Sequence, residues 1–270
     1  MKKYFLIIFF SIASNIHSFA QTAQNYFNQG EVYFEENKLT KAIEAFSKAI
    51  ALDSLLESAY IKRGLAHYAY SQYEAAIEDY TQAMALGAQK AEIYYNRGAA
   101  FYQKNDLEAA KRDFEQSLVL NQAYTPAYVA LGVIWEDRQE FKKALDVYQK
   151  AIDVQPDFYL AHYNKALLYY SLERYKKALI SINKALAVEE QKVEAWFLRG
   201  MLYLEKEAYQ SAIEDFNKAI QVDANYASAW ENRGWAYWYT DAPLRACEDW
   251  QQAVSLGSLQ AKQPLTEKCQ

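Results

Sequence analysis

One spacing dominates this sequence: small residues return every 34 positions from Ala23 to Gln260, with no insertion or deletion. Position 8 of this period is glycine in six segments and Ala166 in the fifth, and position 20 is alanine in all seven. A fixed period of this length is typical of stacked supersecondary units that bury their apolar faces only against one another. The seven segments, within which we number positions from 1 to 34, are 23–56, 57–90, 91–124, 125–158, 159–192, 193–226 and 227–260.

Bulky side chains, most of them aromatic, recur at positions 4, 11 and 24 of the same segments. Two helices approach closely only where a side chain is nearly absent, so these rings are expected to pack against positions 8 and 20. The combined pattern resembles the tetratricopeptide repeat (TPR) family, whose repeat is a pair of antiparallel helices. The resemblance implies an all-α fold, a right-handed superhelical solenoid of seven repeats, with residues 261–270 as a short C-terminal cap or tail. We predict helices at positions 2–14 and 17–30, which in the third segment are residues 92–104 and 107–120.

Positions 7 and 23 vary together among the segments. Arginine at position 7 occurs in the same four segments as aspartate at position 23, and the other three segments have neither. The last of these aspartates has no following segment, so pairing within one repeat explains all four cases. Such a bridge orders the helix pair and implies no ligand. The four predicted pairs are Arg63 with Asp79, Arg97 with Asp113, Arg199 with Asp215, and Arg233 with Asp249.

Residues 1–20 have the pattern of a secretory signal peptide. Lys2 and Lys3 precede an apolar run, and small residues end the segment before Gln21. We predict cleavage before Gln21 and an exported bacterial protein, periplasmic or secreted. The apolar run is shorter than the about 20 residues that span a bilayer, so an uncleaved anchor is the alternative. After cleavage we expect no stable membrane insertion.

Charge and motif content argue against several classes of function. Without the two lysines of the signal peptide, 27 basic residues stand against 34 acidic ones, and the basic residues are dispersed along the repeats. Nucleic-acid binding needs clustered Lys and Arg, so no nucleic-acid partner is expected. No phosphate loop, nucleophile elbow or C-x-x-C pair is present. The two histidines after residue 20, His67 and His162, stand where other segments carry rings. We therefore predict no catalytic residue, no metal and no cofactor.

Apolar side chains gather at the positions that resemblance to TPR proteins places on the concave wall. An exposed apolar groove costs free energy unless a partner covers it, so we predict that these residues bind an extended peptide or protein segment. A superhelix curled enough to shield the rings against one another is the alternative, and glycan or cell-wall polymer binding is the alternative function. The predicted residues are Phe27, Phe34, Ile61, Leu65, Tyr68, Tyr95, Tyr102, Val133, Tyr163, Leu167, Tyr170, Phe197, Met201, Leu204, Trp235, Trp238 and Tyr239.

One ligand class is excluded by the same resemblance. Carboxylate-clamp TPR domains use lysine at position 5 and asparagine at positions 9 and 6. Here position 5 has no lysine and position 9 no asparagine, and the asparagine at position 6 of alternate segments is common in the family. The resemblance therefore implies that this chain lacks that clamp.

The C-terminal end carries two further hypotheses. Trp235 and Trp238 in the seventh segment would lie at the open end of the groove and anchor a partner, or would instead pack against the sixth segment. Cys247 and Cys269 are the only cysteines, and a helix from Ser258 could bring them together as a disulfide, which Pro264 puts in doubt. Two separate thiols are the alternative.

Overall fold

The computed structural model describes residues 22–269, and the predicted signal peptide lies outside them. Within this range the regular structure is helical, with no strand, and the chain divides into two compact units at Ile134, inside helix α7. We describe each unit by itself. The prediction of an all-α solenoid of paired helices is confirmed.

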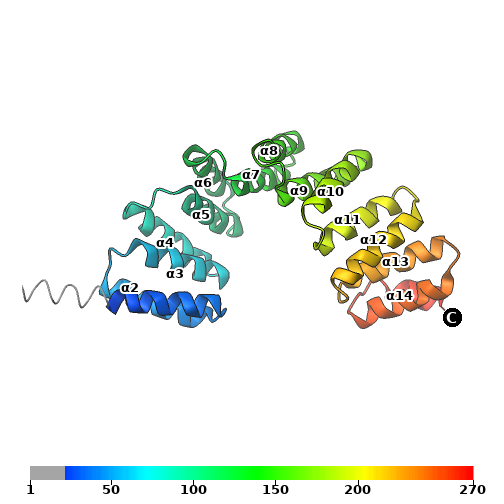
Figure 1. Ribbon diagram of the computed structural model, residues 1–270, viewed down its shortest axis with the longest axis horizontal. Coiled ribbons are helices and arrows are strands. Elements are labelled where there is room, and N and C mark those ends of the chain that lie inside the picture. The colour runs from blue at the N-terminus through cyan, green and yellow to red at the C-terminus, as the bar shows by residue number, and fades with distance from the viewer. Residues whose placement is uncertain (1–21, 270) are drawn as a thin grey trace, which may run out of the picture. The chain divides into compact units, whose positions relative to one another are not determined.

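Unit 1 consists of antiparallel helix pairs stacked in chain order (Figure 1). Its first helix covers residues 22–35. The following helices are α2 (Leu39–Leu52), α3 (Glu57–Ala69), α4 (Tyr73–Ala85), α5 (Ala91–Gln103), α6 (Leu107–Leu120) and the beginning of α7 (Thr125–Asp137). The helices predicted at 92–104 and 107–120 correspond to α5, one residue earlier, and to α6, so both are confirmed.

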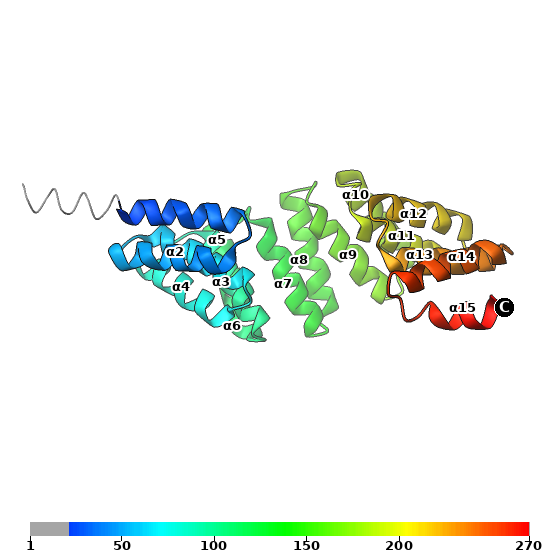
Figure 2. The same ribbon diagram turned by 90° about the horizontal axis from the view of Figure 1, so that it is seen from below.

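Unit 2 continues the same pairing and ends on a short additional helix. Its helices after α7 are α8 (Phe141–Val154), α9 (Tyr159–Ser171), α10 (Tyr175–Val188), α11 (Val193–Leu204), α12 (Tyr209–Val222), α13 (Ala227–Tyr239), α14 (Pro243–Ser255) and α15 (Lys262–Lys268). In Figure 2, α15 lies alongside α14, against which it packs.

The glycines at position 8 let the two helices of a repeat close on a ring. A Cβ atom on Gly200 would lie 2.6 Å from the ring of Phe216, and one on Gly64 would lie 2.9 Å from the ring of Tyr80. Phe216 and Tyr80 have no exposed surface, so neither ring has room to withdraw. In the fifth repeat the pair is Ala166 with Ile182, both fully buried, so a larger residue at position 8 accompanies a smaller one at position 24. The predicted packing of rings on position 8 is confirmed.

Every repeat turns from its first helix to its second through a residue with positive φ at position 15. In the fifth repeat this is Glu173, with φ 57°, and the backbone N–H of Arg174 donates to the carbonyl of Tyr169 at 2.8 Å. This is the hydrogen bond of a Schellman motif, which satisfies a free carbonyl at the helix end. The seven residues are Asn37, Ser71, Asn105, Gln139, Glu173, Glu207 and Asp241, with φ between 56° and 63°. None is glycine; Asn37, Asn105 and Asp241 are of types that adopt positive φ readily, whereas Ser71, Gln139, Glu173 and Glu207 are not.

The C-terminal tail forms a helix that is tied to the last repeat. Cys247 on α14 and Cys269 after α15 form a disulfide with their Cα atoms 5.6 Å apart. The helix begins at Lys262, not at Ser258 as expected, and Pro264 does not interrupt it. Pro264 lies in its first turn, where a missing N–H leaves no helical hydrogen bond unmade.

Candidate partner-binding surface

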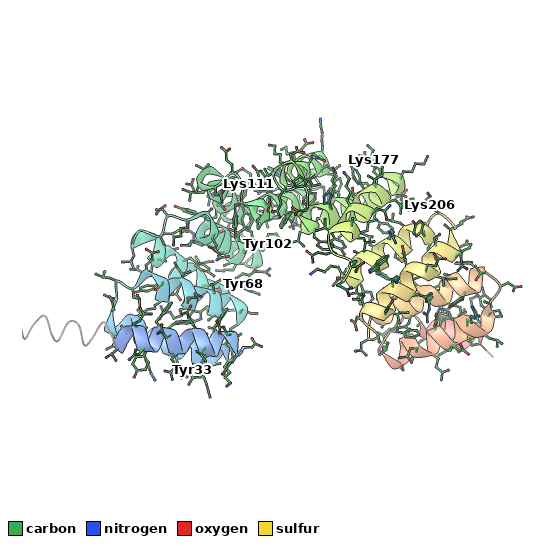
Figure 3. All side chains as sticks on the ribbon, viewed as in Figure 1. Tyr33, Tyr68, Tyr102, Lys111, Lys177 and Lys206 are labelled. Atoms are coloured by element: carbon green, nitrogen blue, oxygen red, sulfur yellow. A yellow bond between two sulfur atoms is a disulfide. The ribbon has the colours of Figure 1, made fainter. Side chains whose placement is uncertain are left out.

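The seventeen apolar residues predicted for the groove all lie on the first helices of their repeats, and we call them the first-helix surface. Leu167 and Tyr239 are exposed, at 41% and 56%, whereas Phe27 is buried at 8%. The other fourteen are half-buried, so each keeps part of its side chain accessible. Figure 3 shows two of them, Tyr68 and Tyr102, along the same side of unit 1, away from Lys111 on α6.

The rings at position 5 are held by the core of their own repeat. Tyr95 packs on Phe114 at 5.6 Å and on Tyr124 at 5.4 Å between ring centroids. Phe197 packs in the same way, at 5.8 Å from Phe216 and 5.3 Å from Tyr226. Their planes are tilted by 42° to 69°. These rings are anchored at one side and accessible at the other, so mutual shielding of the rings occurs but is partial.

In the fifth and sixth repeats, two tyrosines share one carboxylate. The hydroxyls of Tyr170 and Tyr175 donate to the two oxygens of Glu205, at 3.3 and 3.4 Å. The two rings contact each other at 5.8 Å. Burial, and then the charge of Glu205, raise the pKa of Tyr170.

A stack of three rings follows in the sixth and seventh repeats. Tyr239 stacks with Tyr209, at 5.0 Å between ring centroids and 22° between planes, and with Trp235, at 6.1 Å and 28°. Trp235 in turn meets the fully buried Trp250 edge-on at 5.0 Å. The stack is rooted in the core at Trp250, and its most exposed member is Tyr239.

Trp238 is not free at an open end of the solenoid. The ammonium of Lys268, the last residue of α15, lies 4.5 Å from the centre of the Trp238 ring, and Trp250 lies 5.9 Å away. Leu265 and Cys269 belong to the same cluster. The cap helix therefore covers the ring that the sequence suggested as the principal anchor. The alternative, packing of the two tryptophans against Phe197, Met201 and Leu204 of the sixth repeat, stays a hypothesis; those three side chains pack against the core cluster that contains Phe216.

The four predicted Arg–Asp bridges are confirmed. In the sixth repeat both Arg199 Nε and Nη2 donate to the carboxylate of Asp215, each at 2.7 Å. Arg199 Nη1 also donates to Asn183 of the preceding repeat at 2.8 Å, and the guanidinium lies 4.8 Å from the centre of the Trp196 ring. The hydrogen bond to Asp215 raises the pKa of Arg199, which keeps the guanidinium charged. The other three arginines make the same connections, to Ser47, Thr81 and Asn217 of the preceding repeats.

The side chains at position 4, His162 among them, serve the turns between repeats. His162 is buried and its Nε2 donates to the carbonyl of Pro156 at 2.8 Å. Trp196 and Trp230 donate from Nε1 to the carbonyl six residues earlier in the same way. Burial lowers the pKa of His162, so the ring is neutral at pH 7. His67, at position 11, serves the turn within its own repeat: its Nδ1 hydrogen-bonds Oε1 of Gln72 at 2.6 Å. Among residues 22–269, no group of three His, Cys, Asp or Glu side chains converges as metal ligands.

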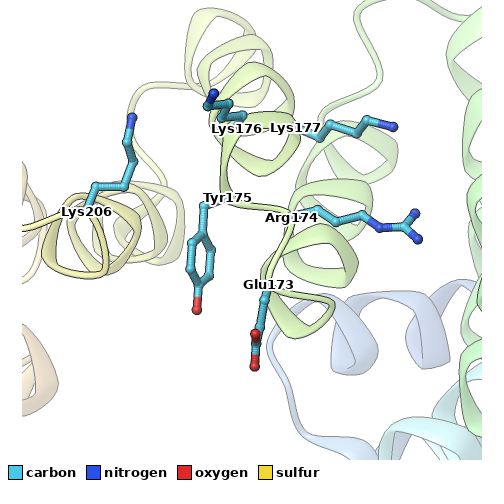
Figure 4. A pocket seen from close by; sticks show the side chains of 6 residues that line it. All are labelled: Glu173, Arg174, Tyr175, Lys176, Lys177 and Lys206. Carbon is cyan, nitrogen blue, oxygen red and sulfur yellow. The ribbon is translucent and has the colours of Figure 1, made fainter.

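One cavity in unit 2 was not anticipated from the sequence. It has a volume of about 460 Å³ and is lined by Glu173, Arg174, Tyr175, Lys176, Lys177 and Lys206 (Figure 4). These residues come from the turn before α10, the first turn of α10 and the turn after α11. A count of charges by repeat, instead of over the whole chain, would have shown the excess of cations here.

Comparison with known families agrees with this architecture. A TPR repeat model matches residues 30–71, 69–104 and 137–173. Tetratricopeptide repeat models match residues 193–226, and residues 91–124 and 159–192. Together these matches cover more than half of the chain. The chain belongs to the tetratricopeptide repeat family. A search of curated proteins gave no match.

Solved structures show the same TPR fold. A tetratricopeptide repeat protein from Parabacteroides merdae is 18% identical with a TM-score of 0.67, covering 93% of this chain and 100% of that one. MamA is 27% identical with a TM-score of 0.55, and the match covers 64% of this chain and 95% of MamA. YrrB, described as a TPR protein with an unusual peptide-binding site, is 23% identical with a TM-score of 0.57, and the match covers 71% of this chain and 99% of YrrB.

In residues 22–269 of the present chain, no helix has the length and apolar character needed to cross a bilayer.

Proposed function

We propose that this TPR protein is a non-catalytic scaffold that binds an extended peptide or protein segment on its first-helix surface. One observation carries the proposal: partly exposed apolar side chains recur on the first helix of every repeat, and most of them pack on one side against a core cluster of buried residues. Exposed apolar area on a rigid support is the usual form of an interaction surface.

The proposal agrees with what TPR domains generally do, which is to mediate protein–protein interactions. Within unit 2 the most accessible members, Leu167 and Tyr239, are those best placed as contacts for a partner. Glycan binding is less well supported, because sugars stack on flat, open ring faces, whereas Tyr95 and Phe197 stand tilted against their neighbours and Tyr239 already stacks with Tyr209 and Trp235.

We propose further that the protein is exported from a bacterial cytoplasm after removal of residues 1–20. The disulfide between Cys247 and Cys269 supports this, because structural disulfides persist in oxidising compartments. Sequencing of the mature N-terminus from the producing cells tests export: Gln21 as the first residue supports it, and Met1 on a membrane-bound product contradicts it.

Site-specific photo-crosslinking tests the binding surface. A photoreactive phenylalanine analogue would replace Leu167, and in a matched control it would replace Ile180, an exposed aliphatic residue on α10 of the same repeat. We expect the variant at Leu167 to capture a defined protein segment that the control does not capture. Equal capture at both positions, or none at Leu167, would contradict the proposed surface.

A further inference from the structure

The fifth repeat differs from the other six in charge. Residues 159–192 contain six Lys and Arg against three Asp and Glu, whereas every other repeat has more acidic than basic residues. The expected even dispersion of basic residues therefore fails at this repeat. Its cationic cavity, introduced above, is consequently a local positive site on a protein with a net charge of −5.

The same repeat has a cation at position 7 but lacks the aspartate that pairs with position 7 in four other repeats. Position 23 is Ser181, and Lys165 at position 7 instead hydrogen-bonds the amide of Gln149. Burial lowers the pKa of Lys165, and the positive charge of Lys184 lowers it further. The fifth repeat thus keeps a net positive charge, although Lys192 pairs with Glu189.

The cations around the cavity are not paired with carboxylates in the part of the chain that the structure describes, although the ammonium of Lys177 lies 5.7 Å from the centre of the Tyr169 ring. Within the described residues, Arg174, Lys176, Lys177 and Lys206 form no salt bridge. Figure 4 shows the Tyr175 ring between Lys206 on one side and Arg174 and Lys177 on the other. In Figure 3, Lys177 and Lys206 lie at the same edge of unit 2. Of the nearby carboxylates, Glu173 lines the cavity and Glu205 accepts hydrogen bonds from Tyr170 and Tyr175.

We propose that this cavity, lined by Arg174, Tyr175, Lys176, Lys177 and Lys206, binds an acidic segment of a protein partner. The inference rests on the proposed function, since it assigns a charge to part of the bound segment. Lysine and arginine supply charge-assisted hydrogen bonds to carboxylates, and Tyr175 supplies an apolar face.

The dimensions of the positive region favour a short acidic peptide over a nucleic acid. The adjacent fourth and sixth repeats each contain six acidic residues, against four and three basic ones. A long polyanion would have to cross these acidic repeats, and its phosphates would be repelled there. A short segment with a few carboxylates would contact the cations of the cavity without crossing the acidic repeats on either side.

The solenoid itself provides the test variant. Residues 175–178 read Tyr-Lys-Lys-Ala, and the same positions of the second repeat, residues 73–76, read Tyr-Glu-Ala-Ala. The double substitution Lys176→Glu with Lys177→Ala therefore introduces a pattern that this fold already accommodates. Lys150→Ala with Lys218→Glu makes the same change in charge at two exposed residues that do not line the cavity.

Fluorescence anisotropy on the full mature chain would measure binding of a labelled peptide of five alternating Glu-Gly pairs. The control probes are the Gln-Gly peptide of equal length and a ten-nucleotide oligothymidylate. We expect the cavity variant to bind the acidic peptide about tenfold more weakly than wild type or the charge control, and wild type to bind the Gln-Gly peptide about tenfold more weakly as well.

Two results would overturn the inference: an equal loss in the charge control, or tighter binding of the oligothymidylate than of the acidic peptide. Circular dichroism of the cavity variant verifies its helicity, and the single variant Lys206→Gln supplies a second test at a turn residue. Failure here is distinguishable from failure of the proposed function, because the crosslinking at Leu167 does not depend on these cations.

Discussion

The packing of position 8 against position 24 leads to a quantitative prediction. In Gly200→Ala the new Cβ would lie 2.6 Å from one ring atom of Phe216 and 2.8 Å from the next, about 1 Å inside the usual carbon–carbon contact. Phe216 is fully buried and has no free space to move into. Overpacking costs about 1–3 kcal/mol, and the better helix propensity of alanine returns about 1 kcal/mol. We therefore expect a net loss of about 1 kcal/mol.

The fifth repeat supplies the compensating change. There Ala166 faces Ile182, so Gly200→Ala combined with Phe216→Ile reproduces a natural pair. Phe216→Ile alone should cost about 1–2 kcal/mol for the lost ring contacts. In the double variant the alanine methyl occupies the vacated space, and we expect a coupling free energy of about 1 kcal/mol or more.

Urea unfolding followed by circular dichroism would measure the cycle, with a nearest-neighbour model for the repeat array. Ala166→Gly is the matched control, since removing the methyl there should also destabilise, by about 1 kcal/mol from helix propensity alone. A double variant whose loss equals the sum of the single losses, or a Gly200→Ala variant more stable than wild type, would refute the packing argument.

Three further predictions concern stability. Asp215→Val should lower the free energy of unfolding by about 3 kcal/mol because it leaves the charge of Arg199 unpaired. Adding Arg199→Leu, which gives the residue pair of the fourth repeat, should recover at least half of that loss in urea unfolding. No recovery would count against the bridge. Because the pKa of His162 is lowered by burial, its stabilising contribution is present above pH 6.5 and is lost as pH falls through the folded pKa. His162→Tyr, which matches the first four repeats, should then flatten the fall in stability between pH 6.5 and lower values, and an unchanged pH profile would oppose this. Opening the Cys247–Cys269 link with Cys269→Ser should cost about 3 kcal/mol and speed hydrogen exchange in α15, whereas unchanged exchange would show that the helix is held by packing alone.

The repeat register could be predicted from the sequence because it rests on contacts within one repeat. A glycine 16 residues before a ring, or an arginine 16 residues before an aspartate, defines two helices and the face on which they meet. No long-range contact is needed for this inference. The structure agrees at Gly200 with Phe216 and at Arg199 with Asp215.

Other features could not be predicted because their cause is spread over several elements. Position 15 adopts positive φ without glycine, since the Schellman hydrogen bonds of the whole turn impose it on residues such as Glu173. Trp238 is covered because α15 folds back in spite of Pro264, which the sequence suggested would interrupt a cap helix. The cationic cavity could not be predicted from the net charge of the chain, because the acidic residues of the other repeats outweigh the positive charge of the fifth repeat.

The central claim is that partly exposed apolar residues on the first helices bind a partner segment. The most direct measurement is calorimetric titration of the segment captured by crosslinking, as a synthetic peptide, into wild type, Leu167→Asp and Ile180→Asp. Both substitutions place a carboxylate at an exposed aliphatic position of the fifth repeat, at 41% and 62% exposure. The account predicts that Leu167→Asp weakens binding about tenfold or more while Ile180→Asp leaves it unchanged. Equal affinities for all three proteins, or a greater loss in Ile180→Asp, would contradict it.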